Sequence, residues 1–132
     1  MILNQITIPC TDYAASVEFY ERLGLIQIVD APPRYARFEC ADGAGATLSL
    51  HAVDNILPGG TVIYFDHESA EKLDHRVEQL KAQGFEFESA PTDQSWGWRE
   101  ARLTDPAGNE VCLMFAGGNR RFPPWRVDGK QA

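Results

Sequence analysis

The sequence predicts an α+β fold in which two βαβββ modules follow one another within a single domain of 132 residues. The first observation is the order of the predicted elements, because a strand, a helix and three further strands occur twice along the chain. The second is the spacing of landmarks in the two halves. Gly24 and Gly84 lie 60 positions apart, and Asp42 and Asp105 lie 63 positions apart. We therefore expect one unit used twice.

Module one is expected at residues 1–57. Its first strand is expected at 2–9, where Ile6 and Ile8 alternate with Gln5 and Thr7. A helix follows Thr11, the expected N-cap, and ends at Gly24, a residue suited to the left-handed backbone of a helix C-terminus. Three short strands, separated by the turn sequences APPR and ADGAG, are expected at residues 25–29, 35–40 and 46–51.

Module two is expected at residues 58–116. An apolar strand at 60–66 precedes Ser69, a typical N-cap, and a helix that ends at Gly84. Apolar residues recur in this helix at i, i+4 and i+7, the spacing of a single buried face. Three more strands are expected at residues 85–88, 98–104 and 110–115.

The pairing of the two modules is expected to create a cleft. A single module is too small to bury both faces of its sheet, so we expect one curved mixed sheet with the helices outside and the cleft on the inner face. Side chains alternate between the two faces of a strand. In module one, this places in the cleft Gln5, Thr7, Tyr35, Arg37, Glu39, Thr47, Ser49 and His51. In module two, it places there Val62, Tyr64, Trp98, Glu100, Arg102, Glu110, Cys112 and Met114.

The charge of the chain excludes several partners. With 12 basic and 19 acidic residues, the net charge is −7. This charge repels phosphate backbones and anionic lipids, so we expect neither nucleic acid nor a membrane as partner. The N-terminal residues lack the basic start of a signal peptide, and the three cysteines form no closely spaced pair. We expect a cytoplasmic protein with reduced thiols.

A tail at residues 117–132 differs from the rest of the chain. It has a net charge of +3, whereas residues 1–116 have −10. Its Gly-Gly and Pro-Pro pairs argue against a helix or a strand, so we expect an extended segment. Trp125, its one large aromatic anchor, is expected to be buried against the body or against a second subunit.

Three segments resemble the vicinal-oxygen-chelate superfamily, which includes glyoxalase I, extradiol dioxygenases and fosfomycin- and bleomycin-resistance proteins. They are TDYAASVEFYERLGL, ATLSL and WGWREARLTDPAGNEVCL. The likeness covers roughly residues 1–116 and implies the same fold, a small organic ligand as partner, and a homodimer.

The resemblance also implies where a divalent metal would bind. In metal-dependent members, His, Gln and Glu side chains on the strands hold the ion, and the four positions fall on Gln5, Ser49, Cys112 and on or near Gly60. Serine and glycine are not suitable ligands, and a thiolate suits a hard ion badly. We expect no cofactor, with a divalent metal left open.

Two functions follow from the resemblance. The first is a metal-free small-molecule-binding protein of the bleomycin-resistance kind, with ligand-binding residues Gln5, Thr7, Tyr35, Arg37, Glu39, Ser49, Tyr64, Trp98, Glu100, Cys112 and Met114. The second is a glyoxalase-like lyase or a dioxygenase with a rearranged metal site built from Gln5, His51 and Glu39 or Glu110. His51 is the candidate catalytic residue, as a general base or metal ligand. It can equally be an inert histidine at a strand end.

Overall fold

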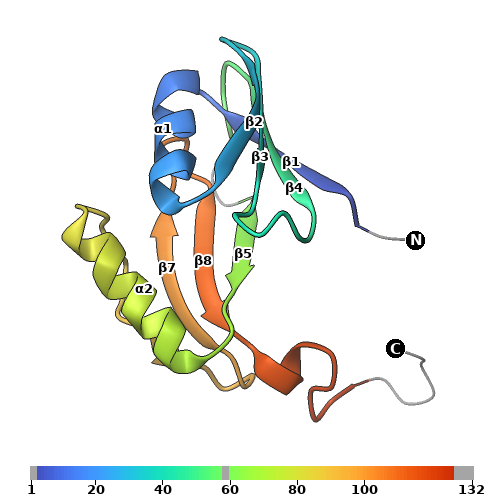
Figure 1. Cartoon of the computed structure of the whole chain (residues 1–132), viewed down its shortest axis with the longest axis vertical. Helices are drawn as coiled ribbons and strands as arrows, with labels where there is room; N and C mark the ends of the chain where they lie inside the picture. The colour runs from blue at the N-terminus through green and yellow to red at the C-terminus, as the bar shows by residue number, and fades with distance from the viewer. Residues whose placement is uncertain (1–2, 58–59, 127–132) are drawn as a thin grey trace. The chain divides into compact units, whose positions relative to one another are not determined.

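The computed structural model describes residues 3–57 and 60–126, which form two helices and eight strands (Figure 1). The first half contains β1 (Gln5–Cys10), α1 (Tyr13–Leu23), β2 (Ile26–Ala31), β3 (Tyr35–Glu39) and β4 (Thr47–Ala52). The second contains β5 (Val62–Asp66), α2 (Ala70–Ala82), β6 (Thr92–Asp93), β7 (Arg99–Thr104) and β8 (Glu110–Phe115). The α+β fold with two βαβββ modules is confirmed.

The strands form two four-stranded sheets, with the orders β1-β4-β3-β2 and β5-β8-β7-β6. In the first sheet, β1 pairs with β4 in parallel, whereas β3 pairs antiparallel with both β2 and β4. Contacts within the chain divide it into two compact units, Met1–Val62 with Thr104–Glu110, and Ile63–Leu103 with Val111–Ala132. No helix among the described residues is long and apolar enough to cross a membrane.

In the first unit, α1 packs beside β2 and buries one side of the sheet (Figure 1). Tyr20 on the helix is fully buried and its ring lies 5.9 Å from that of Phe38 on β3. The Tyr20 hydroxyl donates a hydrogen bond of 2.7 Å to Asp105, whose carboxylate also accepts the backbone N–H groups of Ala107 and Asn109. Burial, followed by the Asp105 charge, raises the pKa of Tyr20. The turn before β8 is thus fixed to the first unit by a buried polar contact.

The helix caps agree with the sequence except at the start of α1 and at the end of α2, where Gln83 rather than the expected Gly84 is the C-cap. Asp12, rather than the expected Thr11, caps α1, because its carboxylate accepts the backbone N–H of Ala15 at 3.1 Å. Gly24 ends α1 with a φ of 117°, as expected. Ser69 caps α2 by accepting the N–H of Lys72 at 3.1 Å, also as expected.

The strand expected at residues 85–88 is wrong. Phe85 is buried at the end of α2 and donates its backbone N–H to Leu80, so it completes the helix terminus instead of starting a strand. One hydrogen bond, from the N–H of Glu88 to the carbonyl of Arg102, reaches β7 from this segment. On the side away from β8, β7 pairs with the two-residue β6, with Thr92 opposite Glu100.

The tail also differs from expectation. Its start forms a short 3₁₀ helix, Gly117–Arg120, in which the N–H of Asn119 donates to the carbonyl of Ala116 and the N–H of Arg121 donates to that of Gly118. Trp125 is 60% exposed within the chain, so it is not buried against the body. Burial against a second subunit stays a prediction, and residues 127–132 lie outside the described part of the chain.

Candidate functional site

The first sheet presents a polar face on the side opposite α1. Strand register puts Thr7, Ser49 and Arg37 in one row across β1, β4 and β3. The alternation of buried and accessible residues agrees, because Ala36, Phe38, Leu48 and Leu50 are buried on the helix side. We call the opposite side the first polar face; it comprises Gln5, Thr7, Tyr35, Arg37, Glu39, Thr47, Ser49 and His51.

A hydrogen-bond network joins four side chains of the first polar face through the hydroxyl of Tyr35. The Tyr35 Oη atom lies 2.7 Å from Oγ of Ser49 and accepts the Nε–H of Arg37 at 3.0 Å. The amide nitrogen of Gln5 reaches the same oxygen at 3.5 Å, and its carbonyl oxygen accepts the hydroxyl of Thr47 at 3.2 Å. Tyr35, Arg37, Ser49 and Gln5, which the sequence placed on one face, are therefore in contact.

The environment of Tyr35 favours its ionised form. The hydrogen bond with Ser49, and then the bond and positive charge of Arg37, lower the pKa of the Tyr35 phenol, while burial acts in the opposite direction. Ser49 itself is fully buried beneath this network. The serine hydroxyl thus supports the phenol and is not itself accessible.

His51 does not join this network. It lies opposite Tyr35 on β4 and is exposed, whereas Glu39 lies at the far end of β3. Their strand positions differ by four residues, which in extended chain is roughly 13 Å. Gln5 pairs with Thr47 and is displaced from His51 by the same four positions. The first sheet therefore does not bring His51 together with Gln5 or Glu39.

The second sheet also presents polar and aromatic side chains, centred on Glu100. This carboxylate is only 3% exposed and accepts the Trp96 indole N–H at 2.7 Å and the Arg102 guanidinium at 2.9 Å. Arg102 also donates to the Tyr64 hydroxyl at 3.4 Å, and the Tyr64 and Trp98 rings meet edge to face at 5.8 Å. One cluster therefore contains Glu100, Arg102, Tyr64 and Trp98, all of which were expected on this face. The sequence analysis did not include Trp96, which donates a hydrogen bond to this cluster.

Cys112 and Met114 lie in the core of the second unit. They are 0% and 2% exposed and form a cluster with Ala116, against which Trp98 packs. This placement agrees with a small buried cysteine that acts as a packing residue. Glu110, by contrast, is partly accessible at the start of β8.

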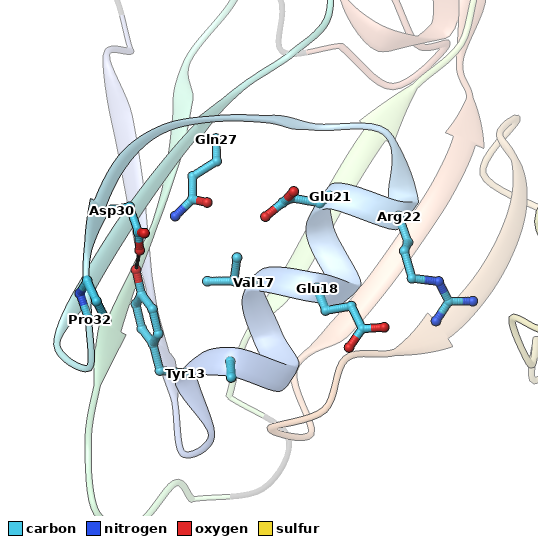
Figure 2. A pocket seen from close by; sticks show the side chains of 9 residues that line it. Tyr13, Val17, Glu18, Glu21, Arg22, Gln27, Asp30 and Pro32 are labelled. Atoms are coloured by element: carbon cyan, nitrogen blue, oxygen red, sulfur yellow. Dashed lines mark hydrogen bonds between the residues drawn. The ribbon is translucent and has the colours of Figure 1, made fainter.

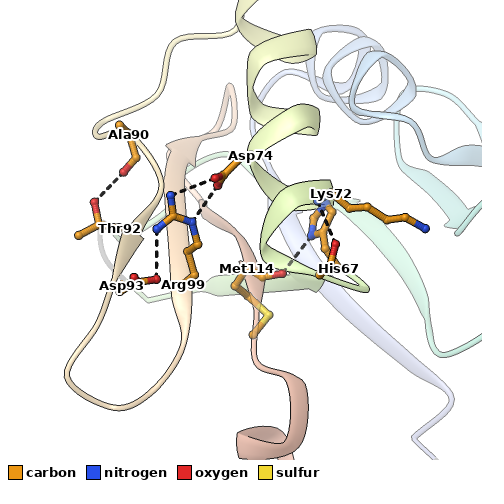
Figure 3. A network of polar contacts seen from close by, with 9 residues as sticks. His67, Lys72, Asp74, Ala90, Thr92, Asp93, Arg99 and Met114 are labelled. Carbon is orange, nitrogen blue, oxygen red and sulfur yellow. Dashed lines mark hydrogen bonds and ion pairs between the residues drawn. The ribbon is translucent and has the colours of Figure 1, made fainter.

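Arg99 on β7 points toward the helix α2, where it meets Asp74 (Figure 3). Its guanidinium donates to both carboxylate oxygens of Asp74 on α2, at 2.8 and 3.1 Å. It also donates to one carboxylate oxygen of Asp93 at 3.1 Å. These bonds raise its pKa. His67 has a structural role as well, because its Nδ1 lies 3.0 Å from the carbonyl oxygen of Met114.

A separate surface pocket of about 540 Å³ lies between α1 and β2, on the helix side of the first sheet (Figure 2). Its wall carries Val17 and the carboxylates of Glu18, Glu21 and Asp30. The Tyr13 hydroxyl donates to Asp30, and partial burial followed by this bond raises the pKa of Tyr13 to about 12. The sequence did not indicate this pair, because Tyr13, Val17 and Tyr20 have the i, i+4, i+7 spacing of an apolar helix face.

The family model of the Glyoxalase/Bleomycin resistance protein/Dioxygenase superfamily matches residues 2–113. The chain belongs to this superfamily. No curated protein sequence matches it significantly.

Solved structures agree on the fold. A glyoxalase/bleomycin resistance protein/dioxygenase from Nocardioides is 25% identical with a TM-score of 0.78, and the match covers 96% of this chain and 89% of that one. A bleomycin-binding protein in complex with bleomycin is 22% identical with a TM-score of 0.71, covering 87% and 98%. Lactoylglutathione lyase from Agrobacterium tumefaciens is 19% identical with a TM-score of 0.73, covering 95% and 96%. The latter two show a shared fold.

The residues that the resemblance assigns to the superfamily's metal-ligand positions are hydrogen-bonded to other side chains, buried, or without a side chain. Gln5 and Ser49 are hydrogen-bonded within the network of Tyr35, Cys112 is fully buried, and Gly60 has no side chain. Within residues 3–57 and 60–126, no three His, Cys, Asp or Glu side chains are grouped so that they could hold a metal ion. This donor set does not fit a divalent metal.

Proposed function

We propose that the protein binds a small organic molecule on the first polar face, and that it does so without a divalent metal. The observation that carries the proposal is the network around Tyr35. The side chains at both expected module-one metal-ligand positions, Gln5 and Ser49, are hydrogen-bonded to the hydroxyl of Tyr35. The positions remain polar, but they are organised for hydrogen bonding rather than for metal coordination.

The first sheet also supplies an apolar surface next to this network. Ile26 on β2 lies opposite Glu39 and Val29 lies opposite Arg37, so both belong to the same side of the sheet. Ile26 is 46% exposed, and Val29 is partly accessible. Binding sites for organic molecules combine such apolar contacts with a few fixed polar groups, and this side of the sheet has both.

The donor chemistry supports binding without metal. Hard ions such as Mg²⁺ and Mn²⁺ need several oxygen or imidazole ligands, and zinc sites use about three or four nitrogen, sulfur or carboxylate donors. The family positions offer one amide, one hydroxyl and one buried thiol. The rearranged alternative of Gln5, His51 and Glu39 is disfavoured by the strand register described above. We therefore prefer binding to the lyase or dioxygenase alternative.

We also propose that the protein acts as a homodimer. Phe122 and Trp125 in the tail are 59% and 60% exposed. The tail has a net positive charge, whereas the rest of the chain has a net negative charge. A second copy offers this tail an acidic surface and a place to bury its aromatic rings.

A thermal-shift screen tests the binding proposal. Protein dialysed against EDTA is incubated with a panel of organic compounds, and we expect at least one chemical class to raise its Tm. The increase is expected to disappear in Tyr35→Phe, which loses the central hydroxyl, and to persist in Tyr13→Phe, which alters a tyrosine on the opposite side of the sheet. Ligand binding that requires added Mn²⁺, Fe²⁺ or Zn²⁺ in every case would contradict the proposal and favour the enzyme.

A further inference from the structure

We infer that the ligand of the first polar face carries a carboxylate or phosphate group, and that Arg37 is the residue that binds it. This inference rests on the proposed function and specifies the chemical class of the ligand. It predicts an amphiphilic organic anion, with its charged group at Arg37 and its apolar part toward β2.

The charge of Arg37 has no carboxylate partner among the described residues, in contrast to two comparable arginines. Arg102 in the second unit lies 2.9 Å from Glu100, and Arg99 bonds to Asp74 and Asp93. By the 63-residue spacing of the modules, Glu100 occupies the position that Arg37 has in module one. The same position of the repeated fold is therefore occupied by an ion-paired glutamate, Glu100, in the second unit. In the first unit it is occupied by an arginine, Arg37, that has no carboxylate partner among the described residues.

Tyr35 fixes the direction of the Arg37 side chain. The Nε–H donates to the Tyr35 hydroxyl at 3.0 Å, and the guanidinium lies over the tyrosine ring at 5.6 Å. Tyr35 precedes Arg37 by two residues, whereas Glu39 follows it by two, so the guanidinium turns away from the nearest carboxylate of its own strand. Only the Nε–H is used in this bond, which leaves the N–H groups of the terminal nitrogens for a ligand.

This orientation suits an anion with two oxygens. The terminal edge of a guanidinium donates two parallel hydrogen bonds to a carboxylate or phosphate, and a guanidinium whose rotamer is already held loses less entropy on binding. Arg37 is partly buried, which strengthens such a pair relative to one in open solvent.

The neighbours of Arg37 indicate what is attached to the anion. In its row of the sheet, Ser49 lies on one side and Val29 on the other. Ser49 is covered, and the accessible surface continues toward Val29 and Ile26, which are aliphatic. A charged group at Arg37 joined to a planar or aliphatic body matches this arrangement, whereas a small inorganic anion would leave the apolar part uncovered.

Isothermal titration calorimetry with three probes tests the inference. The probes share one aromatic body and differ in charge: 2-naphthoate, 2-naphthyl phosphate and the neutral 2-naphthamide. We expect at least one of the anionic probes to bind EDTA-treated wild-type protein tenfold or more tightly than the amide. Backbone amide NMR shifts are expected to locate the bound probe on β2, β3 and β4.

Two variants show whether Arg37 is responsible. Arg37→Gln removes the charge and is expected to reduce the preference for the anion to less than threefold. Arg34→Gln makes the same change of charge at an exposed residue of the β2–β3 turn and is expected to keep the preference. Circular dichroism of both variants confirms that they are folded.

The outcomes separate the two proposals. Equal affinity for the three probes, or a preference that survives Arg37→Gln, overturns the inference and leaves the binding proposal standing. Failure of all three probes to bind overturns the inference as well, and the thermal-shift screen then decides independently whether other organic compounds bind. A preference lost equally in Arg34→Gln would assign the effect to general electrostatics and also contradict the role of Arg37.

Discussion

The hydroxyl of Tyr35 lies 2.7 Å from that of Ser49, and this contact connects the accessible surface of the first sheet to a fully buried serine. The arrangement makes Tyr35 the one group through which Arg37, Gln5 and Ser49 are joined. Its removal is therefore expected to affect both stability and binding, and the two effects can be measured separately.

Tyr35→Phe is expected to lower the free energy of unfolding by about 1–3 kcal/mol, because the buried Ser49 hydroxyl loses its partner. Urea denaturation followed by circular dichroism measures this change. Tyr64→Phe is the matched control: this tyrosine is 48% exposed and its hydroxyl makes a longer contact, 3.4 Å to Arg102. We expect the control to change stability by less than about 0.5 kcal/mol. Equal effects of the two substitutions would contradict the importance of the Tyr35–Ser49 contact.

The two tyrosines on opposite sides of the first sheet are expected to titrate in different pH ranges. The pKa of Tyr35 is lowered by Ser49 and Arg37, whereas that of Tyr13 is raised to about 12 by partial burial and Asp30. NMR of protein with ¹³C-labelled tyrosine rings measures both directly. We expect the Tyr35 signal to shift below the pH of an ordinary phenol, about 10, and the Tyr13 signal above it.

These pKa shifts have opposite effects on stability. Tyr35 favours the folded state once its phenol ionises, so its contribution is present above the unfolded pKa of about 10 and is lost as the pH falls through its lower folded pKa. The contribution of Tyr13 is complete below about pH 10 and is lost as the pH rises toward about 12. Tyr13→Phe is therefore expected to reduce the loss of stability between pH 10 and 12. A Tyr35 signal that titrates above that of Tyr13 would refute the assignment.

Glu100→Gln is expected to destabilise the second unit by about 3 kcal/mol, because it removes the buried carboxylate that pairs with Arg102. Arg37→Gln is the informative comparison, since Arg37 has no ion pair among the residues described. We expect Arg37→Gln to change stability by less than about 1 kcal/mol, mainly through the lost bond to Tyr35. Urea denaturation measures both variants. Similar losses of stability in the two variants would indicate that Arg37, like Arg102, is paired with a carboxylate.

Asp12→Ala is expected to cost about 1 kcal/mol of stability, the usual effect of removing a helix N-cap. Thr11→Ala is expected to cost much less, because the carboxylate of Asp12, not the neighbouring hydroxyl, accepts the N–H of Ala15. Thermal unfolding of the two variants compares them under identical conditions. A larger loss of stability for Thr11→Ala would indicate that Thr11 is the N-cap, as expected from the sequence.

The sequence was sufficient to place Gln5, Tyr35, Arg37 and Ser49 on one face, because alternation along a strand and the register of neighbouring strands depend on hydrophobic pattern. It could not show that the Tyr35 hydroxyl joins them, since that depends on side-chain rotamers. It also could not pair Arg99 with Asp74, which are 25 residues apart and meet where α2 packs on β7. The strand expected at 85–88 failed for a similar reason. Phenylalanine and glutamate alternate in this segment, as in a strand. However, the backbone N–H of Phe85 donates to Leu80 and so belongs to the end of α2.

The exposed aromatic residues of the tail lead to a prediction about assembly. We expect multi-angle light scattering to give about twice the chain mass of 14.7 kDa. Trp125→Ala is expected to raise the dimer dissociation constant at least tenfold, because a buried aromatic anchor contributes about 2 kcal/mol or more to an interface. Leu57→Ala is the control, since Leu57 is an exposed apolar residue outside the tail, 88% accessible. Added salt should also weaken the dimer, because the basic tail would then lose attraction for the acidic body of the second copy. A monomeric mass at all concentrations, or dissociation unaffected by Trp125→Ala, would exclude an interface made by the tail.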